Sequence, residues 1–474
     1  MSNNKYRTLA GNILVLGLGQ FGSKLLVYVM LNFYTSMLGK AAYGDLTNII
    51  NAAAICISIF TLSIADGVLR YALDKNNDGK GVLSIGINVV ICGMVIFAAF
   101  TPLVGLLPML AGYEWLVFIY VFMGAVKEIC AIYVRARHSV TIYAVDGIVT
   151  TVSMIIYSLI FMGMFKLGIT GYVFAVVLGD FTSVIFLNVT TKIYKEYRPF
   201  KNDSLLRASM LRYSIPLMPT MIMWWIINTS DSFMVTAFLG NEANGLYGVA
   251  YKFPNLATVI VGIFSQAWRM SAITERNSRT VSKFYSNIFS MMQTVMFLAS
   301  GGIMLILRPL IMPFFVPESF GESFFYVPIL LGAVVFQSFS NFLASIYEAS
   351  NKTTHSLISS TIGAAANIVL NFILIPTIGI AGAAIATLVS YIIVFVYRII
   401  DTKKLLYMKV YWAKIGVNMT LLTIMALSIM FLPFAALQNV INAVIFIIIA
   451  ALNFKSCTQA VRLVLNKKKE KSEN

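Results

Sequence analysis

Charged residues are scarce in this chain. They make up 11% of its 474 residues, whereas hydrophobic residues make up 59%. Soluble domains average about 25% charged residues, so the composition excludes an ordinary soluble protein. Apolar runs of about 20 residues, the length that crosses a bilayer, recur along the whole chain. We therefore predict an all-α polytopic membrane protein without a separate soluble domain.

Residues that carry chemistry are also few. The chain has two histidines, His138 and His355, and four widely separated cysteines. This spacing predicts neither a disulfide framework nor a metal site. No P-loop, HExxH or nucleophile motif is present, which disfavours ATP hydrolysis and other catalysis. We predict a protein that is not an enzyme and has no cofactor, although a membrane glycosyltransferase or polymerase with few polar residues stays an alternative.

The apolar segments and the charges between them predict a topology. About fourteen spans are predicted, near 10–34, 45–69, 82–106, 114–134, 142–165, 168–191, 211–238, 245–268, 285–307, 324–347, 355–376, 379–398, 412–433 and 440–463. Odd-numbered loops hold only Lys40, Lys166 and Arg308, and most other basic residues fall on the opposite side. By the positive-inside rule, both termini then lie in the cytoplasm. This bias and anionic lipid headgroups account for the net charge of +16 without nucleic-acid binding.

Two sequence echoes predict an internal repeat. Residues 168–171 (GITG) resemble 379–382 (GIAG), and each segment opens the sixth span of its half. Leu-Gly and Tyr-Gly pairs within 38–44 resemble those within 239–248, with three extra residues in the later loop. Six is an even number of spans, so the duplicated halves share one orientation.

The repeat predicts three regions. Residues 1–200 and 201–404 are the six-helix halves, and 405–474 hold two further helices and a basic cytoplasmic tail. Duplicated halves are typical of transporters that bind substrate near the midplane and rock one half against the other. The first span has no small-residue cleavage site after it, so we expect it to remain attached.

Three cations inside predicted spans stand out as candidates, namely Lys24, Lys127 and Lys252. A charge at bilayer depth costs from about 3 to more than 10 kcal/mol, so such residues face a bundle interior or a wet cavity. Lys24 lies mid-depth on a polar stripe with Gln20 and Tyr28. Cations of one sign predict an anionic substrate. Helix–helix hydrogen bonding, snorkelling of Lys252 and neutralisation of Lys127 by a nearby acid stay alternatives.

Other polar residues within the spans are candidates for the same cavity. The neutral candidates are Asn51, Tyr251 and Asn255. The acids Asp180, Asp231 and Glu128 are candidates for coupling to an ion, and Asp180 is the most isolated of them along the sequence. A structural ion pair between Asp231 and Lys252, or between Glu128 and Arg135, is the alternative interpretation.

Motifs in the second half carry a family resemblance. They are RYSIPL at 212–217, Asp231, LG at 239–240, GLY at 245–247, AYKFP at 250–254 and GIAGAA at 379–384. In this order they resemble the polysaccharide biosynthesis, oligosaccharide-flippase (Wzx-type) branch of the multidrug/oligosaccharidyl-lipid/polysaccharide (MOP) superfamily. The resemblance covers most of the chain and implies a MATE-like fold.

The resemblance also implies a function. Its members flip an undecaprenyl-diphosphate-linked oligosaccharide across the cytoplasmic membrane for capsule or O-antigen-type polymers, beside polymerases and glycosyltransferases. We expect Lys24 and Lys252 to engage the diphosphate, with Lys127 adding charge. We expect the polar side chains named above to hold sugar hydroxyls: Gln20, Tyr28, Asn51, Tyr251 and Asn255.

Other functions stay open at this point. Lipid II flippases and spore-cortex flippase-like proteins share the fold that the resemblance implies. A drug antiporter coupled to H⁺ or Na⁺ would need acids to dominate the cavity, and here lysines compete with them. A scaffold or polymerase that transports nothing is a further class.

Overall fold

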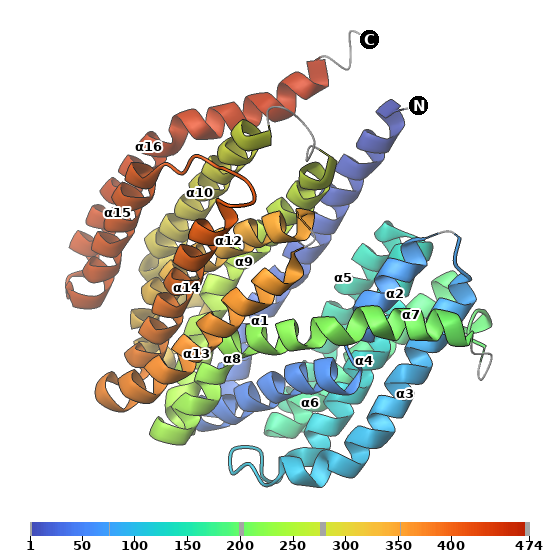
Figure 1. Cartoon of the computed structure of the whole chain (residues 1–474). Helices are drawn as coiled ribbons and strands as arrows, with labels where there is room; N and C mark the ends of the chain where they lie inside the picture. The colour runs from blue at the N-terminus through green and yellow to red at the C-terminus, as the bar shows by residue number, and fades with distance from the viewer. Residues whose placement is uncertain (1, 75, 199–202, 275–280, 351, 470–474) are drawn as a thin grey trace. The chain divides into compact units, whose positions relative to one another are not determined.

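The computed structural model describes the backbone of residues 2–74, 76–198, 203–274, 281–350 and 352–469. Within these ranges it describes side chains from Tyr28 onward, except at 260–261, 263–281, 348–349, 353 and 455–469. Every regular element in the described ranges is a helix (Figure 1). In chain order the α-helices are α1 (Ser2–Phe60), α2 (Ile64–Leu73), α3 (Gly79–Val104), α4 (Glu114–Arg137), α5 (Val140–Ser158), α6 (Gly168–Thr191), α7 (Ser204–Ser214), α8 (Met218–Leu239), α9 (Asn241–Thr274), α10 (Val281–Ile306), α11 (Met312–Phe315), α12 (Val327–Ala349), α13 (Thr353–Ile378), α14 (Ile380–Thr402), α15 (Trp412–Phe431) and α16 (Ala435–Lys469).

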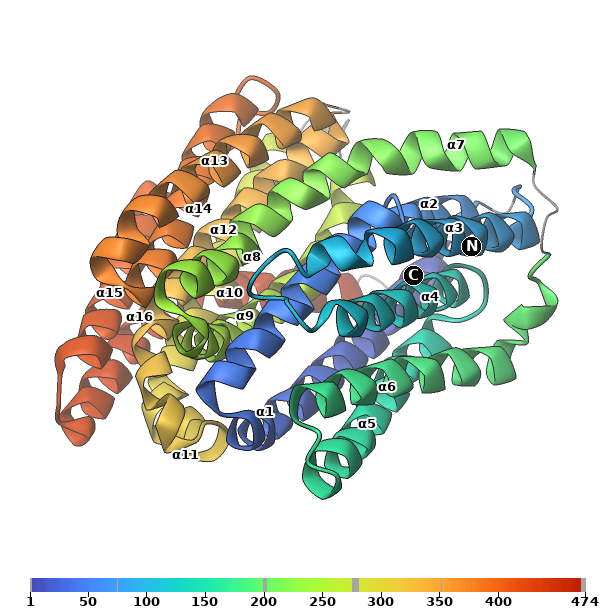
Figure 2. The same cartoon turned by 90° about the horizontal axis from the view of Figure 1, so that it is seen from below.

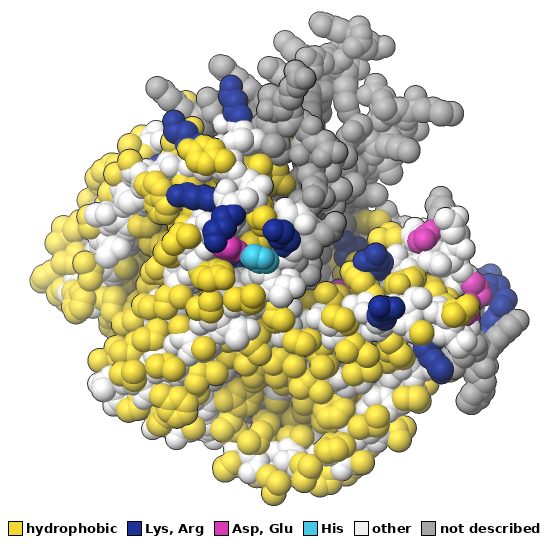
Figure 3. All heavy atoms as spheres, viewed as in Figure 1, with side chains coloured by type: hydrophobic (Ala, Val, Ile, Leu, Met, Phe, Trp, Pro, Cys, Tyr) yellow, Lys and Arg dark blue, Asp and Glu magenta, His cyan; other side chains and the backbone are white. Residues whose placement is uncertain are grey.

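The predicted polytopic membrane fold is confirmed. Among the described residues, eleven helices are long and apolar enough to cross a bilayer. Helix α1 accounts for two predicted spans because it breaks at Gly39, where φ is 72°. Helices α8 and α9 stand where the seventh and eighth spans were predicted. Hydrophobic side chains cover most of the visible face, and charged ones gather in the upper part of the view (Figure 3).

The chain divides into two compact units. The N-unit comprises Leu14–Gly245, and the C-unit comprises Leu246–Asn474 with Met1–Ile13. In the N-unit, α6 packs on both α4 and α5 (Figure 2). In the C-unit, α14 packs on both α12 and α13 in the same pattern, and α15 and α16 lie against α10. The packing therefore repeats, as the sequence echoes predict, while the boundaries at 200 and 404 stay a prediction.

The GIxG echo has a physical reason in both repeats. The first glycine of each motif, Gly168 or Gly379, has a positive φ of 57° or 65°, a region that only glycine enters freely. The second glycine lies against the backbone of the preceding helical segment. A Cβ at Gly171 would lie 3.1 Å from the carbonyl oxygen of Phe161, and one at Gly382 would lie 2.3 Å from that of Leu374. The motif therefore turns the chain and then packs two backbones together.

A second pair of glycines makes a reciprocal contact within the N-unit. A Cβ at Gly44 would lie 2.0 Å from the carbonyl oxygen of Asn241, and one at Gly245 would lie 2.2 Å from that of Lys40. Gly44 therefore corresponds to Gly245, and the predicted match to Gly248 with three extra loop residues is wrong in register. The sequence favoured the wrong match because a Tyr-Gly dipeptide is shared, whereas the contact depends on the absence of a side chain.

This contact yields a stability prediction. Gly44→Ala is expected to destabilise the protein by about 1–3 kcal/mol, because an added methyl group must displace the Asn241 backbone. The apparent melting temperature of the purified protein in detergent measures the change. Gly416→Ala is the matched control, since nothing lies within 4 Å of a Cβ there. Equal melting temperatures for the two variants would show that the backbones do not meet at Gly44.

Candidate functional site

An ion pair lies halfway along two neighbouring helices of the N-unit. The Nζ of Lys127, in the middle of α4, is 2.9 Å from Oδ1 of Asp180, in the middle of α6. The Lys127 side chain remains 28% exposed, whereas that of Asp180 is 11% exposed. At this distance the ammonium and the carboxylate are hydrogen-bonded, and each compensates the other's charge where little water is present. The structure thus selects neutralisation of Lys127 among the alternatives that the sequence left open.

The surroundings of the pair are crowded and charged. Gly124 lies one turn before Lys127, and a Cβ there would be 3.3 Å from Ile57 and 4.0 Å from Asp180. On the next turn of α6, Ser183 donates a hydrogen bond of 2.6 Å to the buried Asp146 of α5. Asp180 is therefore no isolated acid, because α4 and α5 bring a cation and a second acid beside it.

The second repeat has a neutral contact between the corresponding helices, α12 and α14. Tyr391 follows Gly379 in α14 at the same spacing as Asp180 follows Gly168 in α6. Its hydroxyl accepts a hydrogen bond of 2.9 Å from Nε2 of Gln337, in the middle of α12. A neutral hydrogen bond thus joins the fourth and sixth helices of this repeat, where the first repeat uses opposite charges. Packing of these helices does not require an ion pair.

Both histidines take part in a second motif, which occurs once in each repeat. In the N-unit, Glu196 accepts a 2.5 Å hydrogen bond from the hydroxyl of Tyr133 and lies 3.1 Å from Nε2 of His138. This arrangement joins the end of α4 to the segment that follows α6. We call it a tyrosine–acid–histidine clasp.

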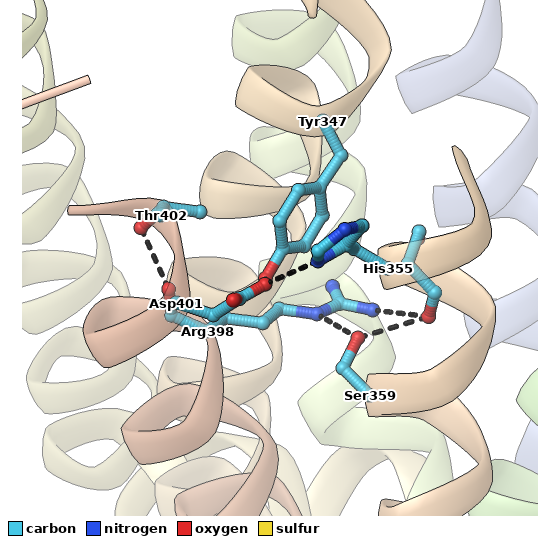
Figure 4. Close-up of polar contacts among 7 residues, drawn as sticks. Tyr347, His355, Ser359, Arg398, Asp401 and Thr402 are labelled. Carbon is cyan, nitrogen blue, oxygen red and sulfur yellow. Dashed lines mark hydrogen bonds and ion pairs between the residues drawn. The ribbon is translucent and has the colours of Figure 1, made fainter. Parts of the chain in front are cut away.

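The C-unit repeats the clasp with an aspartate (Figure 4). Oδ2 of Asp401 accepts a 2.8 Å hydrogen bond from the hydroxyl of Tyr347 and lies 2.8 Å from Nδ1 of His355. Here the end of α12, the start of α13 and the end of α14 are joined. Neither histidine was assigned a role from the sequence. The signal was present, because each follows shortly after a tyrosine near the end of the fourth helix of its repeat.

Two cations of the C-unit were also missed, the buried Arg398 and the half-buried Lys414. Arg398 is fully buried and donates to the Ser359 hydroxyl at 2.8 Å (Figure 4). It also donates to the Ser340 carbonyl at 2.8 Å and to the Ser360 hydroxyl at 3.0 Å. Lys414 of α15 donates to the hydroxyl of Thr294 in α10 at 2.7 Å. Both lie at the edges of predicted spans, where basic residues that flank a membrane helix are expected, so neither stood out as a cation inside the bundle. Helix α14 continues to Thr402, which places Arg398 inside the helix.

The other predicted site residues of the N-unit are placed as follows. Lys24 and Gln20 lie outside the residues whose side chains are described. Tyr28 is buried, Glu128 is exposed, and Asn51 is half-buried. The backbone carbonyl of Asn51 accepts a 2.9 Å hydrogen bond from Trp225 Nε1. The roles of these five residues remain predictions.

The remaining predicted residues belong to two neighbouring helices. Asp231 of α8 is fully buried in the N-unit. Tyr251, Lys252 and Asn255 of α9 are half-buried in the C-unit, where the Tyr251 ring centre is 5.8 Å from that of Tyr247. In the described part of the chain, no three His, Cys, Asp or Glu side chains gather as metal ligands would.

The fold is shared with flippases and transporters of known structure. It resembles the lipid II flippase MurJ in an inward closed conformation, with a TM-score of 0.69 and 15% identity over 94% of this chain and 100% of that chain. It resembles an inward-facing multidrug resistance MATE family transporter of the MOP superfamily, with a TM-score of 0.62 and 14% identity over 82% and 95%. A MOP superfamily transporter from Pyrococcus furiosus gives a TM-score of 0.56 and 14% identity over 83% and 96%. The protein is therefore a membrane protein of the MurJ/MATE fold.

Residues 9–269, more than half of the chain, match the family of polysaccharide biosynthesis proteins, and the chain belongs to that family. The predicted family and the predicted MATE-like fold are both confirmed. An uncharacterised membrane protein of Methanocaldococcus jannaschii is 27% identical over 236 residues. That match covers 48% of this chain and 52% of the relative, so the chain spans about half the length of that protein.

The duplicated clasps generate a double-mutant prediction. Tyr133→Phe and Glu196→Gln should each destabilise the protein by about 1 kcal/mol, because the first removes the donor and the second replaces the charged acceptor with a neutral amide. The double variant should lose less stability than the sum of the two single losses, since both changes weaken the same contact. Tyr347→Phe with Asp401→Asn is the matched cycle in the C-unit. Apparent melting temperatures in detergent measure both cycles, and strictly additive losses would contradict the clasp.

Proposed function

We propose that this protein flips an undecaprenyl-diphosphate-linked oligosaccharide across the cytoplasmic membrane by alternating access. Membership of the polysaccharide biosynthesis family and the MurJ/MATE fold support a lipid-linked glycan as cargo. The observation that carries the proposal is Lys127, a cation halfway along a membrane helix whose side chain is still 28% exposed. No catalytic step is required, because the substrate changes leaflet without changing its bonds.

The chemistry of the cargo fits this cation. A diphosphate brings negative charge into the bundle, and an ammonium group offers three hydrogen-bond donors to phosphate oxygens. Lys24 and Lys252 are the further diphosphate contacts that we propose. Gln20, Tyr28, Asn51, Tyr251 and Asn255 are proposed for the sugar, with Tyr28 entering only if its buried ring moves.

A cation-coupled drug antiporter is the second candidate, since the fold is shared with MATE transporters. It would use Asp180, Asp231 and Glu128 to bind cations. Asp180 is less suited to this role because Lys127 already neutralises it. For the P. furiosus transporter, reverse polarity of the binding pocket suggests a different function. By analogy, cations at mid-depth favour an anionic cargo here. Lipid II, the substrate named for MurJ, is the main alternative cargo.

The remaining parts of the proposal concern orientation and partners. We propose that both termini are cytoplasmic, that the six-helix halves at 1–200 and 201–404 rock during transport, and that 405–474 add two helices. Glycosyltransferases would supply the cargo and a polymerase would consume it. Coupling to H⁺ or Na⁺ through Asp180, Asp231 or Glu128 belongs to the same proposal.

Removing the cation tests the function. In cells that lack the chromosomal gene, Lys127→Ala is expected to reduce polymer export by about tenfold or more, since a hydrogen bond to a charged group contributes about 1.5–3 kcal/mol. Mass spectrometry of the lipid fraction should then show the lipid-linked glycan accumulating, which also identifies the glycan. Lys24→Ala and Lys252→Ala are measured in parallel.

The control for this experiment is Lys403→Ala, which removes an exposed lysine just beyond α14. It should export normally, and Lys127→Arg should retain part of the activity because it keeps the charge. Protein levels in the membrane are measured for every variant. Normal export by Lys127→Ala at a normal protein level would refute the role of Lys127, and absence of any accumulated lipid-linked glycan on gene deletion would refute the function.

A further inference from the structure

The ion pair between Lys127 and Asp180 is stronger than the packing of its helices requires. The second repeat joins the corresponding helices, α12 and α14, with the neutral Gln337–Tyr391 hydrogen bond. Placing two charges in a bundle interior costs desolvation, and well-packed neutral groups often stabilise such a position equally well. The repeat therefore acts as an internal control, and it indicates that the charges serve a purpose other than packing.

The two charges also differ in access. The Lys127 side chain is 28% exposed and that of Asp180 is 11% exposed, so an incoming group reaches the ammonium before the carboxylate. Asp146 accepts a 2.6 Å hydrogen bond from the hydroxyl of Ser183 on its Oδ1, and the salt bridge of Lys127 is with Asp180. Asp180 is consequently the acid that contacts Lys127 directly and that an arriving anion would have to displace.

We propose that Asp180 is an internal competitor that occupies Lys127 when no cargo is bound and exchanges with the cargo's diphosphate. This inference rests on the proposed function. Lys127 then has an anionic partner before, during and after transport, so a bare buried cation never forms. The returning carboxylate displaces the diphosphate and favours release. Asp180 is thus a positioning residue that tunes affinity and need not touch the cargo.

The test measures binding and transport separately. The probe is undecaprenyl diphosphate, added to the purified full-length protein in detergent and detected by native mass spectrometry. Asp180→Asn should bind it about tenfold more tightly, in the usual range of coupling between sites, yet export less polymer in cells because release is slower. Lys127→Gln should bind weakly, and adding Asp180→Asn to it should give no gain. Asp146→Asn is the matched control, and it should change the affinity for undecaprenyl diphosphate less than Asp180→Asn does.

Each outcome separates this inference from the proposed function. If Lys127→Gln weakens binding but Asp180→Asn does not strengthen it, the function stands and the exchange is refuted. If Lys127→Gln does not weaken binding, the role of Lys127 and the exchange are both refuted, whereas the proposed function is decided separately by the glycan that accumulates on gene deletion. An equal gain in Asp146→Asn would reveal a general field effect and overturn the exchange.

A measurement on the unmodified protein covers the case in which Asp180→Asn does not fold. Infrared difference spectra with and without undecaprenyl diphosphate should show a shifted carboxylate stretch. The shift should vanish in Lys127→Gln, which has no ion pair to exchange, and an unchanged carboxylate stretch in the unmodified protein would refute the proposal. The double variant Lys127→Gln with Asp180→Tyr replaces the ion pair with the residue types of the neutral contact, and we call it the graft. It should keep the melting temperature of the unmodified protein and lose binding of undecaprenyl diphosphate. A graft that binds and exports normally would also refute it.

Discussion

A polar group inside a membrane bundle has to find its partner within the protein, because hydrocarbon offers none. This constraint governs the interior of both units. Asn48 donates to the hydroxyl of Thr236 at 2.9 Å and accepts from Asn244 at 2.9 Å. Arg398 lies among serine hydroxyls and a carbonyl, and Lys127 lies against Asp180. These contacts decide which helices can pack together, and the apolar surface then fills in around them.

Comparison of the two repeats separates structural features from functional ones. The GIxG turn and the tyrosine–acid–histidine clasp occur in both repeats. The acid of the clasp differs, being Glu196 in the first repeat and Asp401 in the second. Features that persist through such divergence are those on which the helix packing depends. The mid-helix contact differs, with opposite charges in the first repeat and neutral groups in the second. This asymmetry supports the proposal that Lys127, in the first repeat, binds the diphosphate.

Part of the candidate site could be predicted from sequence. Lys127 was identifiable because a charge at bilayer depth is costly and therefore conspicuous. Its partner was not, since Asp180 lies on a helix far along the chain and sequence distance says nothing about packing. Arg398 was hidden because the length of an apolar run locates a helix end only to within a few residues. Likewise, the register of the first glycine echo depended on a backbone contact that no dipeptide match reveals.

The sequence by itself determined the all-helical membrane fold, the repeat and the positions of the costly charges. These follow from local properties, namely the length of apolar runs, the bias of basic loops and glycines that need a positive φ. Only the tertiary structure decided which charges meet. It brought Asp180 to Lys127, paired each histidine with a carboxylate, and set Gly44 against Asn241. The reason is that partner choice depends on how helices are rotated and placed side by side, which arises from packing across the whole unit.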